Sequence, residues 1–218
     1  MRGRSGLRVR HNRGFTLIET ALATVIIGVG VVAVVEAQQA FLRSNRWSSH
    51  ASSGTLMGNE IRELTRDFPR HDSVSGLMIG GDPPALQGWG TDLGEIVVWD
   101  FDDMDDFDEI QFGNGGQLPG PIDAFGNIIP QILPDGTVVL DGNGNPLPLE
   151  GWSQRVVVQK VLPTNLTQIV ADGHVILPGP GVGVPVDAFP LRVTVIVEYQ
   201  GPYDPQPVEV NRIVWIVP

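Results

Sequence analysis

The sequence predicts an α+β fold, in which one long N-terminal helix packs on a small antiparallel β-sheet with long loops. Three observations lead to this prediction. A helical pattern without proline runs from Ala37 to Phe68, and Pro69 stops it. Apolar and polar residues alternate at 191–199, which indicates a half-buried strand. Glycine (27 residues) and proline (18 residues) are abundant, which favours short strands and turns over a helical bundle.

The first part of the predicted helix has the composition of a membrane span. Residues 15–35 are apolar apart from threonine and Glu19. At ~1.5 Å per residue such a helix covers about 30 Å, the thickness of the hydrocarbon core of a bilayer. Residues 36–68 continue it as an amphipathic helix, because apolar residues recur mostly at helical spacing with charged residues between them. If the helix breaks, we expect the break at residues 52–54, which are Ser-Ser-Gly.

The segment after Pro69, residues 69–218, is expected to be a β-rich globular domain. Four runs indicate strands: 95–99, 155–161, 191–199 and 208–217. The last two are expected to form a C-terminal hairpin. Because the final run ends in Ile-Val-Trp-Ile-Val, we expect its last part to be buried on both faces. Residues 113–152 are rich in glycine, proline and asparagine and indicate long loops with at most a short hairpin.

The charges are distributed unevenly along the chain. Five arginines precede Gly14, and the first acidic residue is Glu19. By the positive-inside rule this basic segment stays in the cytoplasm and the rest is translocated. Without residues 1–14, nine basic residues face twenty-five acidic ones, a net charge of −16. Such a body argues against binding of nucleic acid, which needs basic patches. The absence of cysteine excludes disulfides and thiolate metal sites.

One short motif carries most of the functional information. The stretch Arg-Gly-Phe-Thr-Leu-Ile-Glu at 13–19 follows the basic segment and opens the apolar span. It resembles the cleavage signal of type IV prepilins and pseudopilins. The resemblance implies that residues 1–14 are a leader, which a prepilin peptidase removes by cutting after Gly14. It also implies that the new N-terminal residue, Phe15, is methylated, and that Glu19 is the glutamate on which filament assembly depends.

Membrane physics gives Glu19 an independent functional meaning. A carboxylate at the start of a membrane helix is costly and needs a partner, so such residues are functional by default. The resemblance implies that this partner is the free amino group of a neighbouring subunit. The residues leave two alternatives open. In the first, the segment is an ordinary signal anchor in which Glu19 has no role. In the second, it is a removable secretory signal peptide that is cut near Ala37.

Weaker similarity extends beyond the motif. The span, the helix end Gly-Asn-Glu-Ile-Arg-Glu-Leu and the final strands resemble I-type minor pseudopilins and V-type minor pilins. The resemblance implies a structural subunit of a type II secretion pseudopilus or a type IV pilus, with a pilin-like fold. Its expected partners are prepilin peptidase, other pilin or pseudopilin subunits, the inner-membrane assembly platform and membrane lipid. Its expected location is the inner membrane as a single-pass protein, with a cytoplasmic N-terminus and an extracytoplasmic domain, and then the filament.

Two other functions stay open. One is a membrane-anchored extracytoplasmic binding or adhesion module, and the other is a pseudopilin of a competence system for DNA uptake. An enzyme is not expected, because the histidines are scattered without ligand spacing and no serine stands in a nucleophile motif.

An acidic cluster offers the strongest metal hypothesis. Six aspartates crowd one short segment: Asp100, Asp102, Asp103, Asp105, Asp106 and Asp108. So many carboxylates repel one another unless they are solvated or bridged by a hard cation, and Ca²⁺ takes six to eight oxygen ligands. The spacing does not fit an EF-hand loop. The alternative is a solvated acidic loop with no cofactor.

Overall fold

The structure is a computed structural model that describes residues 16–179 and 183–218. The leader predicted at 1–14 and the residues Gly14 and Phe15 therefore lie outside the described residues. The chain divides into two units, Met1–Ser48 and Ser49–Pro218. One helix, α1 (Leu17–Leu64), belongs to both of them.

In the first unit, α1 is apolar and exposed. Val25, Ile26 and Ile27 are each more than 60% exposed. The helix is long and apolar enough to cross a membrane. The predicted single helix is confirmed, with ends close to those expected. The helix also continues without interruption through residues 52–54, the place named for a break if one occurred.

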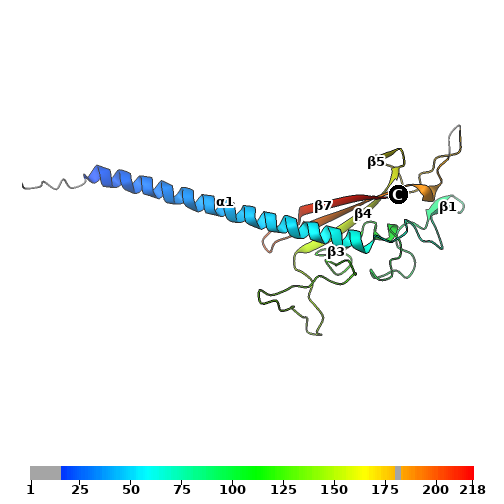
Figure 1. Cartoon of the computed structure of the whole chain (residues 1–218), viewed down its shortest axis with the longest axis horizontal. Helices are drawn as coiled ribbons and strands as arrows, with labels where there is room; N and C mark the ends of the chain where they lie inside the picture. The colour runs from blue at the N-terminus through cyan, green and yellow to red at the C-terminus, as the bar shows by residue number, and fades with distance from the viewer. Residues whose placement is uncertain (1–15, 180–182) are drawn as a thin grey trace, which may run out of the picture. The chain divides into compact units, whose positions relative to one another are not determined.

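The second unit is built around an antiparallel sheet with the strand order β3-β4-β6-β7 (Figure 1). The strands are β3 (Gln111–Gly113), β4 (Trp152–Leu162), β6 (Leu191–Tyr199) and β7 (Val208–Val217). A further strand, β5 (Asn165–Ile169), pairs with the end of β4, and β1 (Met78–Gly80) pairs with β2 (Ala85–Gln87). Short 3-10 helices occur at η1 (Asp105–Phe107) and η2 (Val186–Ala188). The predicted C-terminal hairpin is confirmed as β6 and β7.

The end of α1 covers one face of this sheet, as Figure 1 shows. Met57 and Ile61 of the helix share a buried core with alternate residues of β6, including Val193, Val195 and Val197. This alternation arises because successive side chains of a strand point to opposite faces. The other face of β4, β6 and β7 points away from the helix.

Buried Gln154 on β4 fastens the helix to the sheet and to the loop that precedes β4. Its amide nitrogen donates to the carbonyl of Met57 at 2.8 Å and to the carbonyl of Ile122 at 3.0 Å. Its amide oxygen accepts from the backbone N–H of Ile122 at 2.7 Å. A fully buried amide is stable only when its donors and acceptors are paired in this way.

Three further expectations about the strands can be compared with the structure. Residues 95–99 do not form a strand, because they turn around the carboxylate of Asp100, which accepts from the N–H groups of Ile96 and Val97 at 3.1 Å each. The end of β7 is not buried on both faces, because β7 ends the described sheet and Val214 is 51% exposed. Residues 113–152 are loops with isolated β-bridges, as expected.

Two glycines allow the helix to approach β7 closely. A Cβ added to Gly58 would lie 2.6 Å from Cγ1 of Ile213, and one added to Gly54 would lie 3.2 Å from Cγ1 of Val210. Both glycines are buried within the helix. These glycines stabilise the fold by leaving space for β7. The gain from this close contact outweighs the roughly 0.5–1 kcal/mol that glycine costs in a helix relative to alanine.

We expect Gly58→Val to lower the unfolding free energy by about 1–3 kcal/mol, because the added methyl groups overpack the contact with Ile213. Urea unfolding of the full chain in detergent, followed by tryptophan fluorescence, measures the effect. Gly142→Val is the matched control, since a Cβ at Gly142 meets no atom within 4 Å. Equal stability of the two variants would show that close packing at Gly58 is unimportant.

Candidate functional site

The N-terminal end of α1 is closed by a reciprocal pair, Thr16 and Glu19. The backbone N–H of Thr16 donates to Oε2 of Glu19 at 3.0 Å, and the hydroxyl of Thr16 donates to the same oxygen at 3.1 Å. In return, the N–H of Glu19 donates to Oγ1 of Thr16 at 3.3 Å. This is a capping box, which satisfies N–H groups that the first turn of a helix leaves without partners.

The sequence reasoning treated Glu19 only as a charge and missed its role as a cap. The signal was present, because threonine followed three residues later by glutamate, directly before an apolar run, is the pattern of a capping box. Glu19 is exposed within the described chain. Its carboxylate therefore has an internal partner and is also accessible to a second one.

The acidic cluster is the second candidate site, and it is not a solvated loop. Asp103, Asp105 and Asp106 are 3%, 0% and 2% exposed, which corrects that alternative. Asp103 accepts from the N–H groups of Asp105 and Asp106 at 2.9 and 3.1 Å. Asp106 accepts from the N–H groups of Asp102 and Asp103 at 3.0 and 3.2 Å. These carboxylates thus replace water as partners of a tight backbone segment.

Burial changes the ionisation of these aspartates. Desolvation is the main reason why the pKa of Asp103 rises to about 8, and the hydrogen bond with Asp105 and the charge of Asp105 raise it further. Desolvation and the charge of Asp103 raise the pKa of Asp106 to about 8. For Asp105, desolvation raises the pKa to about 6, although hydrogen bonds from Asp103 and from the N–H of Gly90 oppose it. At neutral pH the cluster therefore retains protons that solvated aspartates would release.

A buried histidine and a buried lysine adjoin this cluster. Nδ1 of His71 lies 2.8 Å from Oδ1 of Asp105, and both side chains are at most 5% exposed. Desolvation, followed by the charge of Lys160, lowers the pKa of His71 to about 4, so the ring is neutral at pH 7 and donates from Nδ1. Lys160 is fully buried and donates to the carbonyls of Asp172 and Val186. Sequence reasoning gave neither residue a role, because their proximity depends on tertiary structure.

Two of the six predicted metal ligands converge with a third carboxylate. Oxygens of Glu95, Asp102 and Asp106 lie within 4.8 Å of one another, a spacing that a cation can bridge. Glu95 was absent from the prediction because it lies outside the aspartate run. The other four aspartates accept hydrogen bonds from backbone N–H groups or, in one case, from the imidazole of His71: Asp100, Asp103, Asp105 and Asp108.

The N-terminal segment matches a known family model. Residues 9–35 match the prokaryotic N-terminal methylation motif, the signal of type IV pilins and pseudopilins. The chain carries a type IV pilin-like signal. No curated protein and no solved structure matches the chain. The matched span contains the capping pair Thr16 and Glu19 and the apolar part of α1.

The match indicates how the chain is processed and where it is anchored. The signal marks the pilin-like chain as a substrate of prepilin peptidase that assembles with other pilin-type subunits. Together with the apolar helix, it indicates a membrane-anchored protein. The arrangement of α1 on an antiparallel sheet agrees with a pilin-like fold. The match ends at residue 35, so it carries no information about the acidic cluster.

We expect the unfolding free energy of the chain to fall by about 2 kcal/mol from pH 6.5 to pH 8, which is the effect of releasing about one net proton over this window. The folded pKa values of Asp103 and Asp106, about 8, lie above the ordinary 3.8. Their stabilising contribution is present below the unfolded value and is lost as the pH rises through about 8. His71 has the opposite effect, but only between about 4 and 6.5, and Lys160, whose pKa desolvation lowers from 10.5 to about 8, opposes the fall mainly above pH 8. Urea unfolding in EDTA measures the slope.

Asp106→Asn should flatten this pH dependence, whereas Asp135→Asn should preserve it, because the N–H of Thr137 holds the pKa of Asp135 below its usual range. An unchanged slope in Asp106→Asn would contradict the assignment. Calcium stays a prediction, and the same unfolding assay without EDTA tests it. Binding at Glu95, Asp102 and Asp106 would raise the unfolding midpoint at millimolar calcium by mass action. A constant midpoint would leave the cluster with a structural role alone.

Proposed function

We propose that this pilin-like chain is a minor structural subunit of a type II secretion pseudopilus or a type IV pilus. One observation carries the proposal: the methylation motif at 9–35 contains the start of a helix whose apolar residues are exposed, and whose first turn holds an exposed carboxylate, Glu19. An apolar helix needs lipid or other apolar helices around it. A membrane provides the first environment, and a filament core provides the second.

The proposed pathway follows from these properties. Prepilin peptidase cuts after Gly14 at the cytoplasmic face and methylates Phe15. The subunit waits in the inner membrane with residues 69–218 outside the cytoplasm. The assembly platform then moves it into the filament, where apolar helices pack together and the β-rich bodies form the surface. In this pathway the chain performs no enzymatic reaction, and calcium is an optional ligand of its acidic cluster.

Two alternative functions predict different behaviour of Glu19. A membrane-anchored binding or adhesion module does not need this carboxylate, since a charge only weakens membrane insertion. A competence pseudopilin needs it as a filament subunit does, but operates beside a DNA-uptake system. The net charge of −16 for residues 15–218 disfavours direct contact with DNA in that case.

Processing provides the first test of the proposed function. We expect intact-mass analysis of the membrane-extracted protein to show a chain that starts at Phe15 and carries one methyl group. Gly14→Leu should block the cut, because its side chain obstructs the backbone that the peptidase must reach. A mature start near Gln38, or an uncut chain in cells that contain the peptidase, would refute the proposed processing.

The second test separates the charge of Glu19 from its role as a cap. Glutamine also closes a capping box, so Glu19→Gln keeps the hydrogen bonds with Thr16 but removes the charge. We expect Glu19→Gln and Glu19→Leu to insert into the membrane normally and to lose at least nine-tenths of their incorporation into filaments. The physical reason is that the amino group of a neighbouring Phe15 would then lie in the apolar core without an opposite charge. Cross-linking to other pilin-type subunits measures incorporation.

Thr16→Ala is the matched control, because it removes a capping hydroxyl and leaves the charge intact. It should weaken the first turn by about 1 kcal/mol and still enter filaments. Normal incorporation of Glu19→Gln would show that the charge is dispensable and would favour the anchored-module alternative.

A further inference from the structure

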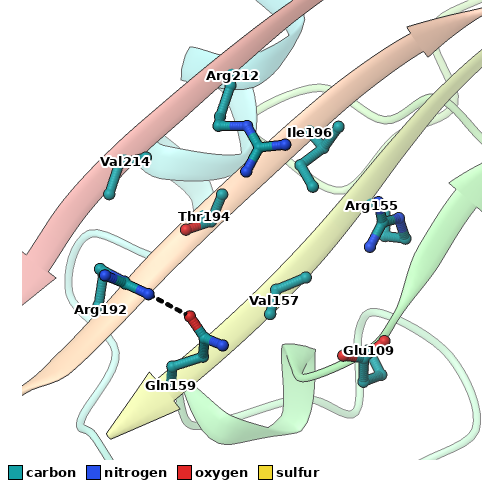
Figure 2. Close-up of a pocket in the computed structure, with 9 residues that line it drawn as sticks. All are labelled: Glu109, Arg155, Val157, Gln159, Arg192, Thr194, Ile196, Arg212 and Val214. Atoms are coloured by element: carbon teal, nitrogen blue, oxygen red, sulfur yellow. Dashed lines mark hydrogen bonds between the residues drawn. The ribbon is translucent and has the colours of Figure 1, made fainter. Parts of the chain in front are cut away.

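The sheet face that points away from α1 contains a trough edged by arginines. We call it the arginine trough. It is formed by the alternate side chains on this face within residues 155–159 of β4, 192–196 of β6 and 212–214 of β7. Two cross-strand rows define it: Arg155, Ile196 and Arg212, followed by Val157, Thr194 and Val214. Figure 2 shows their side chains on the same face. They line a depression of about 510 Å³, in which apolar Val157 and Val214 flank polar Thr194 and the surrounding arginines carry positive charge.

Two of the three arginines of the trough have no carboxylate partner. Arg212 pairs with Glu209 at 2.8 Å, but among the described residues no ion pair involves Arg155 or Arg192. Arg192 donates to the side-chain oxygen of Gln159 at 2.7 Å, as the dashed line in Figure 2 marks. Its buried Nε has no hydrogen-bond partner in the described structure. Guanidinium groups left in this state gain strong hydrogen bonds when a carboxylate arrives.

The position of these arginines is unusual for so acidic a body. Residues 49–218 contain seven basic and twenty-three acidic residues, and three of the basic ones line the trough. Glu109 is the one acid among the described lining residues, and it is exposed at the edge. The trough therefore presents positive charge on an otherwise negative surface, which favours an acidic partner.

A second surface of the same chain has the complementary chemistry. Residues 92–102, here called the acidic loop, expose large apolar side chains between acids. Leu93, Ile96 and Trp99 are 108%, 75% and 64% exposed. Glu95 and Asp102 hold carboxylate oxygens within 4.8 Å of each other. Exposed apolar side chains clustered in this way mark interaction sites.

The acidic loop is held in one conformation by its own hydrogen bonds. The N–H of Asp92 donates to Oε2 of Glu95 at 2.6 Å, and the N–H groups of Ile96 and Val97 both donate to Oδ2 of Asp100. A loop that is already ordered loses little entropy when it binds. Its apolar and acidic side chains therefore form a fixed surface that another molecule can receive.

We propose that the arginine trough of one chain receives the acidic loop of a second copy. Arg155 and Arg192 pair with Glu95 and Asp102, while Leu93 and Ile96 cover the floor at Val157 and Val214. Among the described residues no ion pair links trough and loop within one chain. The contact joins two different surfaces, so it is heterologous and links two copies head to tail. This docking rests on the proposed function as a filament subunit.

Disulfide trapping in the full chain tests the docking, and the absence of native cysteine makes the result unambiguous. Val214→Cys is placed in one co-expressed copy and Leu93→Cys in the other, in cells that assemble filaments. Oxidation in EDTA, which removes divalent cations from Glu95 and Asp102, should give a disulfide-linked dimer. Tyr203→Cys replaces Leu93→Cys as the control, because Tyr203 is equally exposed, at 95%, but lies outside the acidic loop. That pair should give no dimer.

Charge exchange makes the test specific. Arg192→Glu in the copy with Val214→Cys should reduce the dimer at least tenfold, and Asp102→Arg in the other copy should restore it. Arg155→Glu in the same copy is a second variant that should lose the dimer. Restoration of the dimer by Asp102→Arg shows that the copy with Arg192→Glu is folded. A dimer that persists in both loss variants overturns the docking, as does a dimer that Asp102→Arg fails to restore.

Filament incorporation is measured in parallel by shearing and isolating filaments. Incorporation without the disulfide overturns the docking and leaves the proposed function intact. No incorporation of the unaltered chain overturns the proposed function and the docking together. A disulfide to another protein in place of a second copy overturns the choice of partner.

Discussion

The body of this protein depends on the close contact between the end of α1 and the sheet. Gly54 and Gly58 remove side-chain volume where the helix meets β7, and Gln154 hydrogen-bonds across the same layer. Van der Waals attraction falls steeply with distance, so a gap of even one methyl group weakens such an interface. The contact also exposes the other sheet face, because a helix can cover only one side. The arginine trough exists as a consequence of that one-sided cover.

The sequence predicted the elements whose signals are local. Helical spacing and Pro69 located α1, and an alternation that Ile196 interrupts located β6 to the residue. The strand is more deeply buried than the half-buried strand expected, because Thr194 and Ile196 are buried as well. The signal at 9–35 needs no tertiary structure to be read, because a peptidase recognises it as a linear motif. Residues 52–54, the place named for a possible break, stay helical for a physical reason. Serine and glycine weaken an isolated helix, but here the tertiary contact with β7 needs Gly54.

The acidic cluster shows where local reasoning stops. Its aspartates crowd a short segment of the sequence, so we expected their repulsion to be relieved by water or by a cation. In the fold, Phe107 and Phe112 lie in the core beside this segment, and the carboxylates turn to the backbone and to each other. The cluster meets His71 and Lys160, which are far away in the sequence, and the convergence of Glu95 with Asp102 and Asp106 depends on how the loop between them folds. Periodicity and composition contain no information about such contacts between side chains in the folded protein.

The position of β7 at the end of the described sheet has a consequence for solubility. An edge strand presents backbone donors and acceptors to any strand that comes near, which is a route to uncontrolled aggregation. β7 is irregular where it would pair best, since its register with β6 shifts between Val197 and Glu198. Beside the shift, Arg212 and Glu209 place opposite charges three residues apart. A foreign strand would therefore meet an irregular backbone and an existing charge pair on this part of the edge, which makes regular pairing there less favourable.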